Sequence, residues 1–185
     1  MVIDTLPKAL VRMVGIEPER VAMRRKELGV WHDIHWSEYL EKVKDVALGL
    51  HELGVCKGDH VAIIGENQPE WLFSALGGMS AGATFVGIYT TNPVTECEYV
   101  VGHAGAVVYI CEDEEQLDKA LACRQNTPTL RKMIVWDMEG LRHFQDPMVM
   151  SFDDLLALGR KTAEEDPLLF ERLVAGGCGE DIAGI

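Results

Sequence analysis

A short polar segment of the chain gathers three hydroxyl groups and one amide between an apolar stretch and a proline. It runs through Tyr89, Thr90, Thr91 and Asn92 and is followed by Pro93. Hydroxyl and amide groups donate and accept hydrogen bonds, so this segment could form a wall of a ligand cleft. The structural alternative is that Asn92 or Thr91 caps a following helix, which leaves Tyr89 and Thr90 in need of another partner. These four residues are our candidates for substrate binding.

A second polar turn, Gly65-Glu66-Asn67-Gln68-Pro69, has a similar form. Its structural interpretation is a helix start, in which Asn67 caps the helix and Pro69 takes the first helical position. Both turns are predicted to follow strands of an open α/β sheet. Ligands bind such sheets outside the carboxyl ends of the strands, so the two turns are the candidate ligand-binding loops.

Several motifs that would identify a reaction are absent from the sequence. It contains neither GxGxxG nor GxxxxGK, the two common phosphate-cradling loops. No HExxH follows the histidines, and His32 and His35 would point to opposite faces of a strand, whereas zinc needs converging ligands. Residue spacing therefore nominates no catalytic residue and no metal ligand.

Strand and helix signals alternate through the middle of the chain. Short apolar runs bounded by glycine or proline predict strands, and the amphipathic segments between them predict helices. The expected strands cover 60–65, 84–88, 106–111 and 132–136, and the expected helices cover 67–82, 92–103 and 113–123. Strands separated by helices pair in parallel and are covered on both faces. We therefore predict an α/β fold, a three-layer α/β/α subdomain with a mostly parallel sheet.

The segments before this sheet predict a short helix and a small N-terminal β-hairpin. The helix is expected over 5–14, and the hairpin over 20–36 with its turn at Leu28-Gly29. Ser37 is expected to cap the long helix that follows, because serine accepts hydrogen bonds from the first helical amides.

The pattern weakens after residue 136. Residues 137–150 are predicted to be a loop, Ser151 to cap a helix over 152–160, and Pro167 to start another short helix. Trp71 has the spacing of a core residue on its helix and is predicted to be buried.

Composition limits the partners of the chain. Its formal net charge is −13, which should repel phosphate backbones, so nucleic acid is not expected as a partner. The five cysteines are odd in number and include no CxxC pair, which favours reduced thiols and a cytoplasmic protein. No stretch approaches the ~18 apolar residues of a membrane span. Peripheral contact with a membrane stays open as an alternative.

These elements together resemble a known family. The stretch GENQPEW at 65–71 resembles the "xENxPEW" segment of adenylate-forming enzymes, the superfamily of acyl-CoA synthetases, luciferases and adenylation domains. HWSEYL at 35–40 is similar to an early element of that family, and 79–89 to its "AGA" turn between helix and strand. GIYTTNPVTEC at 87–97 looks like the long-chain acyl-CoA synthetase branch, and GEDIA at 179–183 resembles the acidic lead-in to the family's phosphate loop.

The resemblance implies a function. Family members activate a carboxylate, here a long-chain fatty acid, with ATP and Mg²⁺ to an acyl-adenylate, and then transfer the acyl group to CoA. It also implies that Tyr89, Thr90, Thr91 and Asn92 lie near the acyl and CoA side of the cleft. The family's phosphate loop would begin a few residues beyond Ile185. Without it, the chain is expected to bind ATP, Mg²⁺ and CoA poorly and to be inactive by itself.

The same resemblance suggests a domain organisation. Residues 1–185 would form the N-terminal part of the large AMP-binding domain of such a ligase. Within it, 1–58 would hold the N-terminal helices and hairpin, 59–136 the parallel α/β core, and 137–185 a loop and helices leading to the phosphate loop. Apolar surface that another part of the enzyme covers would then be exposed, so the chain is expected to self-associate.

Two other classes of protein remain compatible with the sequence. One is a stand-alone α/β binding or regulatory module without catalysis, which the absent phosphate loops allow. The other lies within the superfamily and comprises aryl-CoA ligases, amino-acid adenylation domains and luciferase-like oxygenases.

Overall fold

The computed structural model describes residues 2–185, and its centre is a five-stranded parallel sheet. The strands are β3 (His60–Ile64), β4 (Thr84–Ile88), β5 (Val108–Cys111), β6 (Lys132–Val135) and β7 (Val149–Ser151). Their order is β4-β3-β5-β6-β7, and every neighbouring pair is parallel. The predicted α/β fold is confirmed, with one more strand than the sequence indicated.

The additional strand, β7, lies in the segment that was predicted to be a loop, together with a 3-10 turn, η1 (Glu139–Leu141). It is three residues long and only half-buried, and it pairs along β6 from Met133–Val149 to Val135–Ser151. The loop prediction for 137–150 is therefore wrong at its end. So short an edge strand has no apolar run that could reveal it.

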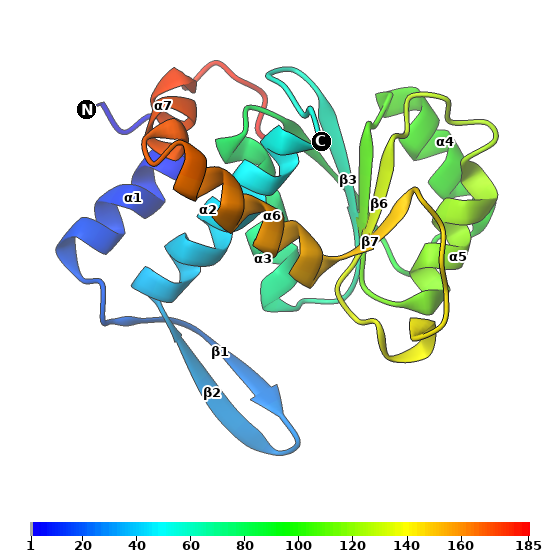
Figure 1. Cartoon of the computed structure of the whole chain (residues 1–185), viewed down its shortest axis with the longest axis horizontal. Helices are drawn as coiled ribbons and strands as arrows, with labels where there is room; N and C mark the ends of the chain where they lie inside the picture. The colour runs from blue at the N-terminus through cyan, green and yellow to red at the C-terminus, as the bar shows by residue number, and fades with distance from the viewer. Residues whose placement is uncertain (1) are drawn as a thin grey trace.

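Helices cover both faces of the sheet (Figure 1). One face carries α4 (Val94–Ala104) and α5 (Glu114–Cys123). The other carries α2 (Trp36–Glu52), α3 (Pro69–Ser80) and α6 (Phe152–Glu165), with α1 (Leu6–Ile16) and α7 (Leu169–Gly176) packed against α2. This arrangement is the expected three-layer α/β/α subdomain.

The central strand β3 shows how one strand supplies both cores. Successive side chains of a strand point to opposite faces. Val61 and Ile63 accordingly lie in the core under α2 and α3, and Ala62 and Ile64 lie in the core under α4 and α5. All four are fully buried, as the apolar run in the sequence indicated.

Two helices start with side-chain caps, and one of these, Ser151, was predicted. Asp113 accepts a hydrogen bond from the Gln116 amide at 3.0 Å, which caps α5. Ser151 accepts one from the Asp154 amide at 3.0 Å, which caps α6. Both caps satisfy amides that have no partner within the helix.

The predicted cap of α2 is wrong. The N-cap is His35, without a side-chain cap, and Ser37 lies inside the first turn. The first amides of the helix donate instead to the backbone that enters the hairpin, with Trp36 bonded to the Arg20 carbonyl at 3.1 Å. Because this contact spans 16 positions of the chain, no local pattern reveals it.

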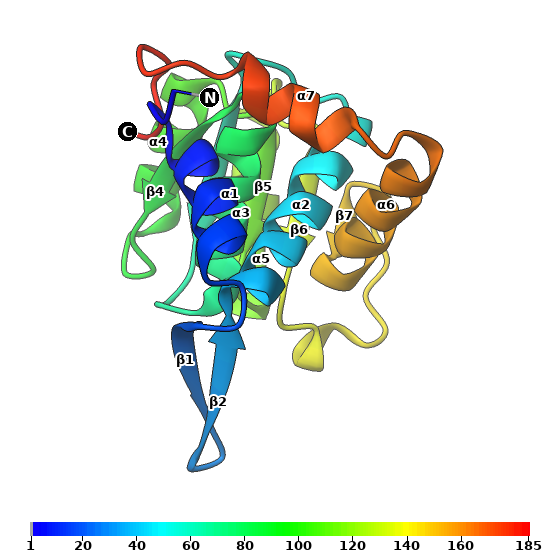
Figure 2. The same cartoon turned by 90° about the vertical axis from the view of Figure 1, so that its left-hand side faces the viewer.

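The hairpin consists of β1 (Val21–Glu27) and β2 (Val30–His35), which pair antiparallel. Its turn is Leu28-Gly29, as predicted, and both residues have positive φ, 46° and 83°. The hairpin projects away from the helices and the sheet (Figures 1 and 2).

The C-terminal segment adds a further backbone pairing at the free edge of β4. The Phe85 amide donates to the Ala183 carbonyl, and the Ile185 amide donates to the Phe85 carbonyl, both at 3.0 Å. Gly184 forms a parallel bridge with Phe85. The last residues of the chain therefore lie beside the strand that leads to the candidate loop at Tyr89.

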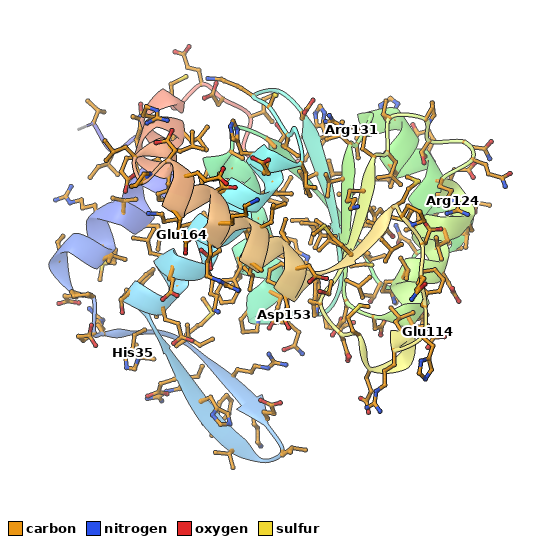
Figure 3. The ribbon with its side chains drawn as sticks, viewed as in Figure 1. His35, Glu114, Arg124, Arg131, Asp153 and Glu164 are labelled. Atoms are coloured by element: carbon orange, nitrogen blue, oxygen red, sulfur yellow. The ribbon has the colours of Figure 1, made fainter. Side chains whose placement is uncertain are left out.

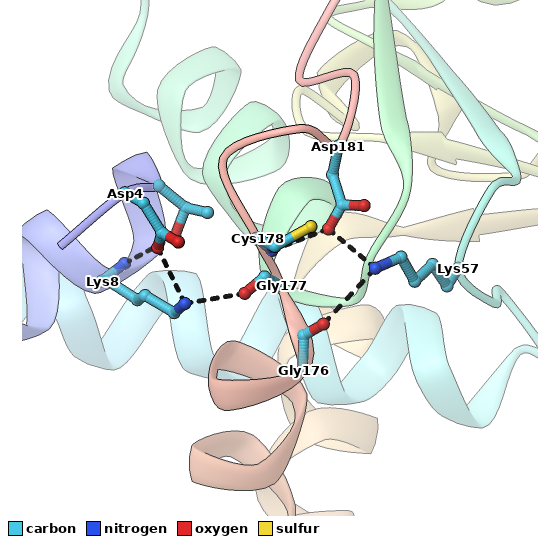
Figure 4. Close-up of polar contacts among 8 residues, drawn as sticks. Asp4, Lys8, Lys57, Gly176, Gly177, Cys178 and Asp181 are labelled. Carbon is cyan, nitrogen blue, oxygen red and sulfur yellow. Dashed lines mark hydrogen bonds and ion pairs between the residues drawn. The ribbon is translucent and has the colours of Figure 1, made fainter. Parts of the chain in front are cut away.

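Two lysines hold the start of this segment (Figure 4). Lys57 pairs with Asp181 at 2.8 Å, and Asp181 also accepts the Cys178 amide at 2.8 Å. Lys8 is almost fully buried and donates to Asp4 at 2.8 Å and to the Gly177 carbonyl at 2.7 Å. Hydrogen bonding to Lys57 lowers the pKa of Asp181, so this contact persists to acidic pH.

Most charged side chains point outward, as Asp153 and Glu164 do in Figure 3. Arg124, labelled there as well, pairs with Asp146 at 2.6 Å. Exposed pairs of this kind contribute little to stability. Acidic groups outnumber basic ones over the chain as a whole, which leaves an acidic surface.

Candidate functional site

The two candidate loops lie side by side at the carboxyl edge of the sheet. β3 and β4 pair in parallel up to Ile64 and Ile88, so the residues that follow both strands emerge at the same edge. β5 pairs with β3 on its other side and ends at Cys111, which brings Glu112 to this edge as well. Three loops therefore meet here.

Glu66 connects these three loops. Its carboxylate accepts a hydrogen bond from the Thr90 hydroxyl at 2.9 Å, which joins the loops after β3 and β4. Its own amide donates to the Glu112 carboxylate at 2.7 Å, which joins the loop after β5. Hydrogen bonds to charged groups are the stronger ones, so Glu66 and Glu112 fix the relative positions of the loops.

Thr90 is held from a second side by Lys119 of α5. The ammonium group donates to the Thr90 carbonyl at 2.5 Å and lies 3.5 Å from Glu115. The Lys119 side chain is only 13% exposed, so this contact is shielded from solvent. Hydrogen bonds from Lys119 and to Glu66 thus hold Thr90 in place, and the Thr90 hydroxyl is already used in the bond to Glu66.

The other three candidates differ in how open they are. Tyr89 is 80% exposed, Thr91 is exposed and Asn92 is half-buried. The Asn92 amide donates to the Tyr89 carbonyl at 3.0 Å, which closes a turn. Within residues 2–185, the side chains of Thr91 and Asn92 make no hydrogen bond, and they remain available to a ligand.

The capping alternative for this loop is wrong. The N-cap of α4 is Pro93, and no side chain caps the helix. The Pro93 carbonyl instead accepts the amides of Glu96 and Cys97, at 3.0 and 3.1 Å, which begins the helix one residue later than a cap at Asn92 would. Asn92 and Thr91 therefore have no structural role as caps.

The loop after β3 shows a similar departure. Its helix α3 begins at Pro69, as predicted, but its N-cap is Gln68 and not Asn67, and no side chain caps it. Asn67 is exposed and lines a groove of about 280 Å³ between this loop and the hairpin. The lining residues of this groove are Met23, Arg24, Asn67, Gln68, Pro69, Trp71 and Leu72.

A larger apolar groove, which we call the α1–α3 groove, runs between these two helices. It has a volume of about 580 Å³. Its lining is almost wholly apolar and consists of Leu6, Ala9, Leu10, Met13, Trp36, Tyr39, Trp71, Leu72, Ala75, Leu76, Met79 and Phe85. The burial predicted for Trp71 is therefore only partly realised, because it is half-buried in the wall of this groove. Its spacing correctly marks an apolar stripe, but residues 2–185 leave that stripe uncovered.

The α1–α3 groove reaches toward the candidate loop along β4. Phe85 lines the groove and packs edge-on against Trp71, with ring centroids 5.6 Å apart. Gly87 and Tyr89 follow Phe85 on the same face of the strand, because side chains of a strand alternate. An apolar surface thus leads to a cluster of hydroxyl and amide groups.

Beneath the loop lies a buried group of thiols around Tyr109. Burial raises the pKa of Cys97 and raises that of Cys123 to about 11, so both are neutral at physiological pH. Burial likewise raises the pKa of Tyr109, whose hydroxyl has no hydrogen-bond partner among the described residues. Neutral, buried thiols are poor nucleophiles, so this group is part of the core.

One serine stands in the GxSxG spacing of hydrolase nucleophiles, Gly78-Met79-Ser80-Ala81-Gly82. Such a nucleophile needs an exposed turn between strand and helix. Ser80 instead ends helix α3, is 1% exposed and donates to the Leu76 carbonyl at 2.7 Å. It is therefore a structural residue.

Residues 2–185 show neither a group of metal-ligating side chains nor a membrane-spanning helix. In that part of the chain, no three His, Cys, Asp or Glu side chains are grouped so as to hold a metal ion. Nor does any of its helices combine the length and apolarity needed to cross a membrane.

Sequence reasoning missed Glu66, Glu112 and Lys119 as the residues that fix the site. Their contacts span 24, 46 and 29 positions of the chain, beyond the reach of any local pattern. A usable signal was the place of Glu66 and Glu112 directly after predicted strands, where side chains of a parallel sheet converge.

Comparison with known proteins places these features in a family. A family model described as "AMP-binding enzyme" matches residues 12–168. The long-chain-fatty-acid–CoA ligase ACSBG1 of Bos taurus is 31% identical over 144 residues, which are 78% of this chain and 20% of that protein. The ligase ACSBG2 of Homo sapiens is 30% identical over 161 residues, which are 84% of this chain and 23% of that protein. The chain thus spans about a fifth of the length of these curated relatives.

Solved structures share the fold. The anthranilate CoA ligase AuaEII, in complex with anthranoyl-AMP, matches with a TM-score of 0.71 and 24% identity over 82% of this chain and 27% of its own. Coronafacic acid ligase from Pectobacterium brasiliense matches with a TM-score of 0.71 and 18% identity, over 82% of this chain and 29% of its own. The chain therefore belongs to the family of AMP-binding enzymes, the adenylate-forming ligases.

Proposed function

We propose that the chain is the N-terminal part of the large AMP-binding domain of a long-chain fatty acid–CoA ligase. In this reaction ATP activates the fatty acid as an acyl-adenylate, with release of pyrophosphate, and CoA then takes the acyl group as a thioester. The observation that carries the proposal is the identity of about 31% with long-chain-fatty-acid–CoA ligases over 78% of the chain.

The geometry at the carboxyl edge of the sheet supports a role in substrate binding. A fatty acid has a long apolar chain and one polar end, and the α1–α3 groove leads along β4 toward the hydroxyl and amide groups of the candidate loop. In this proposal Tyr89, Thr91 and Asn92 contact the substrate, and Thr90 positions them through Glu66 and Lys119.

ATP, Mg²⁺ and CoA are the cofactors and co-substrate of the proposed reaction. The carboxylates of residues 2–185 do not converge into a ligand set for Mg²⁺, so none of them is assigned to the metal. ATP would supply the adenylyl group and CoA the thiol, and no step of the reaction is assigned to a residue of this chain.

The test is a panel of carboxylates offered to the complete gene product with ATP, Mg²⁺ and CoA. Thioester formation, measured by mass spectrometry, is expected with palmitate and to be much weaker with benzoate and amino acids. Preference for an aryl acid or an amino acid would move the protein to another branch of the superfamily. Absence of any thioester would favour a binding or regulatory module.

We also propose that residues 1–185 alone do not complete the reaction, because they contain no Ser/Thr/Gly-rich loop followed by a lysine, the phosphate loop that the family resemblance implies. The isolated chain is expected to give no palmitoyl-CoA above a boiled control. Thioester above that control would contradict this part of the proposal.

Exposed apolar side chains and free cysteines suggest how the chain associates and in which compartment it lies. The groove exposes Leu6 and Leu72, 59% and 43% accessible, and we propose that the isolated chain self-associates through this apolar surface. Five free cysteines favour a reducing compartment, and we propose the cytoplasm. Association with a membrane would be peripheral.

A further inference from the structure

Trp136 brings a fourth loop to the carboxyl edge of the sheet, beside the three loops that Glu66 connects. It directly follows β6, which pairs with β5, and β5 in turn pairs with β3. The register aligns the ends of these strands, so Gly65, Glu112 and Trp136 follow one another in a row across the edge. The loops after four neighbouring strands therefore meet here.

The indole of Trp136 reaches across the end of β5 to the backbone of Gly65. Side chains of a strand alternate between its faces. Ile63 and Ile134, two residues before Gly65 and Trp136, both lie in the core under α2 and α3, and Trp136 packs against that same core. A Cβ at Gly65 would overlap two ring carbons of Trp136, Cζ2 and Cη2. The indole therefore occupies the space that a side chain at position 65 would need.

Only a long side chain at position 136 can make this contact. Neighbouring strands lie about 4.8 Å apart, so β6 is about 10 Å from β3, with β5 between them. The carbons that reach Gly65 are the ones at the far end of the indole. An aliphatic side chain at position 136 would end short of Gly65. The contact thus combines the largest side chain on β6 with the absence of a side chain after β3.

Gly65 has no side chain of its own to anchor it. Glycine has access to more backbone conformations than any other residue, so its position depends on what packs around it. Besides Trp136, the Glu112 Cβ lies close, 3.1 Å from the place of a Cβ at Gly65. Glu112 is also tied to the loop after β6, because its carbonyl accepts the Asp137 amide at 2.7 Å. Gly65 is therefore held by the loops that follow β5 and β6.

The position of Gly65 determines that of Glu66, the next residue of the chain. The Glu66 amide donates to the Glu112 carboxylate at 2.7 Å. The Glu66 carboxylate accepts the Thr90 hydroxyl at 2.9 Å. A shift of Gly65 would therefore move the group that holds Thr90, and with it the neighbouring side chains of the candidate loop.

We propose that Trp136 is a positioning residue for fatty acid binding. Its ring packs on Gly65 and thereby sets the place of Glu66, of Thr90 and of the substrate-contacting side chains at positions 89, 91 and 92. In this role Trp136 acts through Gly65 and need not touch the substrate. Its effect on activity rests on the proposed ligase function, whereas its effect on the loop rests on the contacts described above.

The experiment measures thioester formation by the complete gene product with palmitate, ATP, Mg²⁺ and CoA. Trp136→Ala is expected to raise the KM for palmitate about ten-fold and to change kcat and the KM for ATP by less than about two-fold. Trp136→Phe keeps a ring and should raise the KM for palmitate only about three-fold. This milder variant also serves if Trp136→Ala does not fold. An unchanged KM for palmitate in both variants overturns the proposal.

Val174→Ala is the matched control for loss of stability. Val174 of α7 is buried in a separate core with Ala47 and Leu48 of α2. A smaller folded fraction lowers the apparent kcat for every substrate but leaves KM unchanged, so this control should keep the parental KM for palmitate. A rise in that KM equal to the rise in Trp136→Ala overturns the proposal, because the effect would then be general.

Gly65→Ala tests the contact from its other side. The added methyl group would overlap the indole, so this change alone should raise the KM for palmitate about ten-fold or more. Trp136→Leu removes the two ring carbons, and adding Gly65→Ala to it should raise the KM by less than about two-fold further. Equal effects of Gly65→Ala in the two backgrounds overturn the proposal.

Hydrogen exchange without substrate gives a readout that does not depend on activity. The amides of 89–92 in the complete gene product should exchange about ten-fold faster in Trp136→Ala and at the parental rate in Val174→Ala. Unchanged exchange in Trp136→Ala overturns the positioning role, even where KM rises, because Trp136 would then contact the substrate directly. If no carboxylate yields a thioester, the proposed function fails, and exchange still decides whether Trp136 holds the loop.

Discussion

Two helix pairs on the same face of the sheet meet in opposite ways. Between α2 and α6 the backbones are in contact. A Cβ at Gly159 would lie 2.6 Å from the carbonyl carbon of Asp45, and one at Gly49 would lie 2.5 Å from the Leu155 carbonyl oxygen. Between α1 and α3 the helices leave a groove of about 580 Å³ lined by large apolar side chains. The α2–α6 pair is therefore closely packed, whereas the α1–α3 pair leaves an open groove.

The difference marks where the described residues leave apolar surface uncovered. Small residues at a helix crossing allow close approach, and the α2–α6 pair completes its own core. The large residues on α3, such as Trp71 and Leu76, cannot be covered by α1 alone. Uncovered apolar surface beside a polar loop is what a binding site for an amphipathic ligand or a partner requires.

The largest effect is expected from Gly159→Ala, which adds one methyl group to the closed pair. The new carbon would overlap backbone atoms of Asp45, and backbone cannot move aside as a flexible side chain can. We expect a loss well above about 3 kcal/mol and no cooperative unfolding transition in circular dichroism.

Gly15→Ala is the matched control, because a Cβ at that helical glycine meets no atom within 4 Å. It should leave stability unchanged or raise it by about 0.5–1 kcal/mol. A Gly159→Ala protein with parental stability would show that the two helices are not in the contact described.

Leu155→Ala is expected to cost about 3 kcal/mol, measured by urea unfolding. Leu155 of α6 is fully buried in the core under α2, so its loss leaves a cavity. Leu168→Ala removes a leucine that is 64% exposed and should change stability by less than about 0.5 kcal/mol. Equal losses in the two variants would contradict the assigned burial.

Thr90→Val is expected to cost about 1 kcal/mol and to loosen the candidate loop. Valine keeps the shape of threonine but removes the hydrogen bond to Glu66. Hydrogen exchange of the amides in 89–97 should therefore rise, while Thr91→Val, whose hydroxyl makes no bond within residues 2–185, should leave it unchanged. An equal rise in hydrogen exchange in both variants would contradict the claim that the Thr90–Glu66 hydrogen bond holds the loop.

Tyr39→Phe is expected to make stability less sensitive to alkaline pH. Tyr39 lies at the edge of the α1–α3 groove, and burial raises its pKa from 10.0 to about 12. The unfolded chain ionises first, so the stability due to neutral Tyr39 is present below pH 10 and is lost as the pH rises toward 12. Urea unfolding between these pH values should show up to about 2 kcal/mol less loss in the variant. A parental pH profile for Tyr39→Phe would contradict this.

The smallest effect on stability is expected from Leu6→Gln with Leu72→Gln, at the rim of the open groove. Each side chain is already exposed, so each change should alter the free energy of unfolding by less than about 0.5 kcal/mol. The same double variant should convert self-associated chain to monomer in light scattering. Tyr99→Gln, an exposed position on the other face of the molecule, should leave association unchanged. A parent chain that is monomeric at high concentration would refute self-association.

Much of the fold could be predicted from the sequence because its signals are local. Asp113 and Ser151 cap their helices, and Leu28-Gly29 turns the hairpin, by contacts within three residues. The apolar runs of β3, β5 and β6 mark strands that are buried on both faces. By contrast, the start of α2 depends on a carbonyl at Arg20, and β7 exists through its pairing with β6.

The place of the candidate loop after a strand was predicted, but the contacts that hold this loop were not. The segment from Tyr89 to Asn92 was identified by its polar composition, and it does follow a strand of the sheet. The partners that hold it, Glu66 and Lys119, come from other loops and helices. Trp71 shows a further limit, because its spacing marks an apolar face without telling what covers that face.

The central claim is that this domain serves the activation of a fatty acid by ATP. The most direct measurement is carboxylate-dependent exchange of labelled pyrophosphate into ATP by the complete gene product. The account predicts exchange that requires Mg²⁺ and is faster with palmitate than with benzoate or anthranilate. No exchange with any carboxylate, or exchange that is faster with an aryl acid, would contradict it.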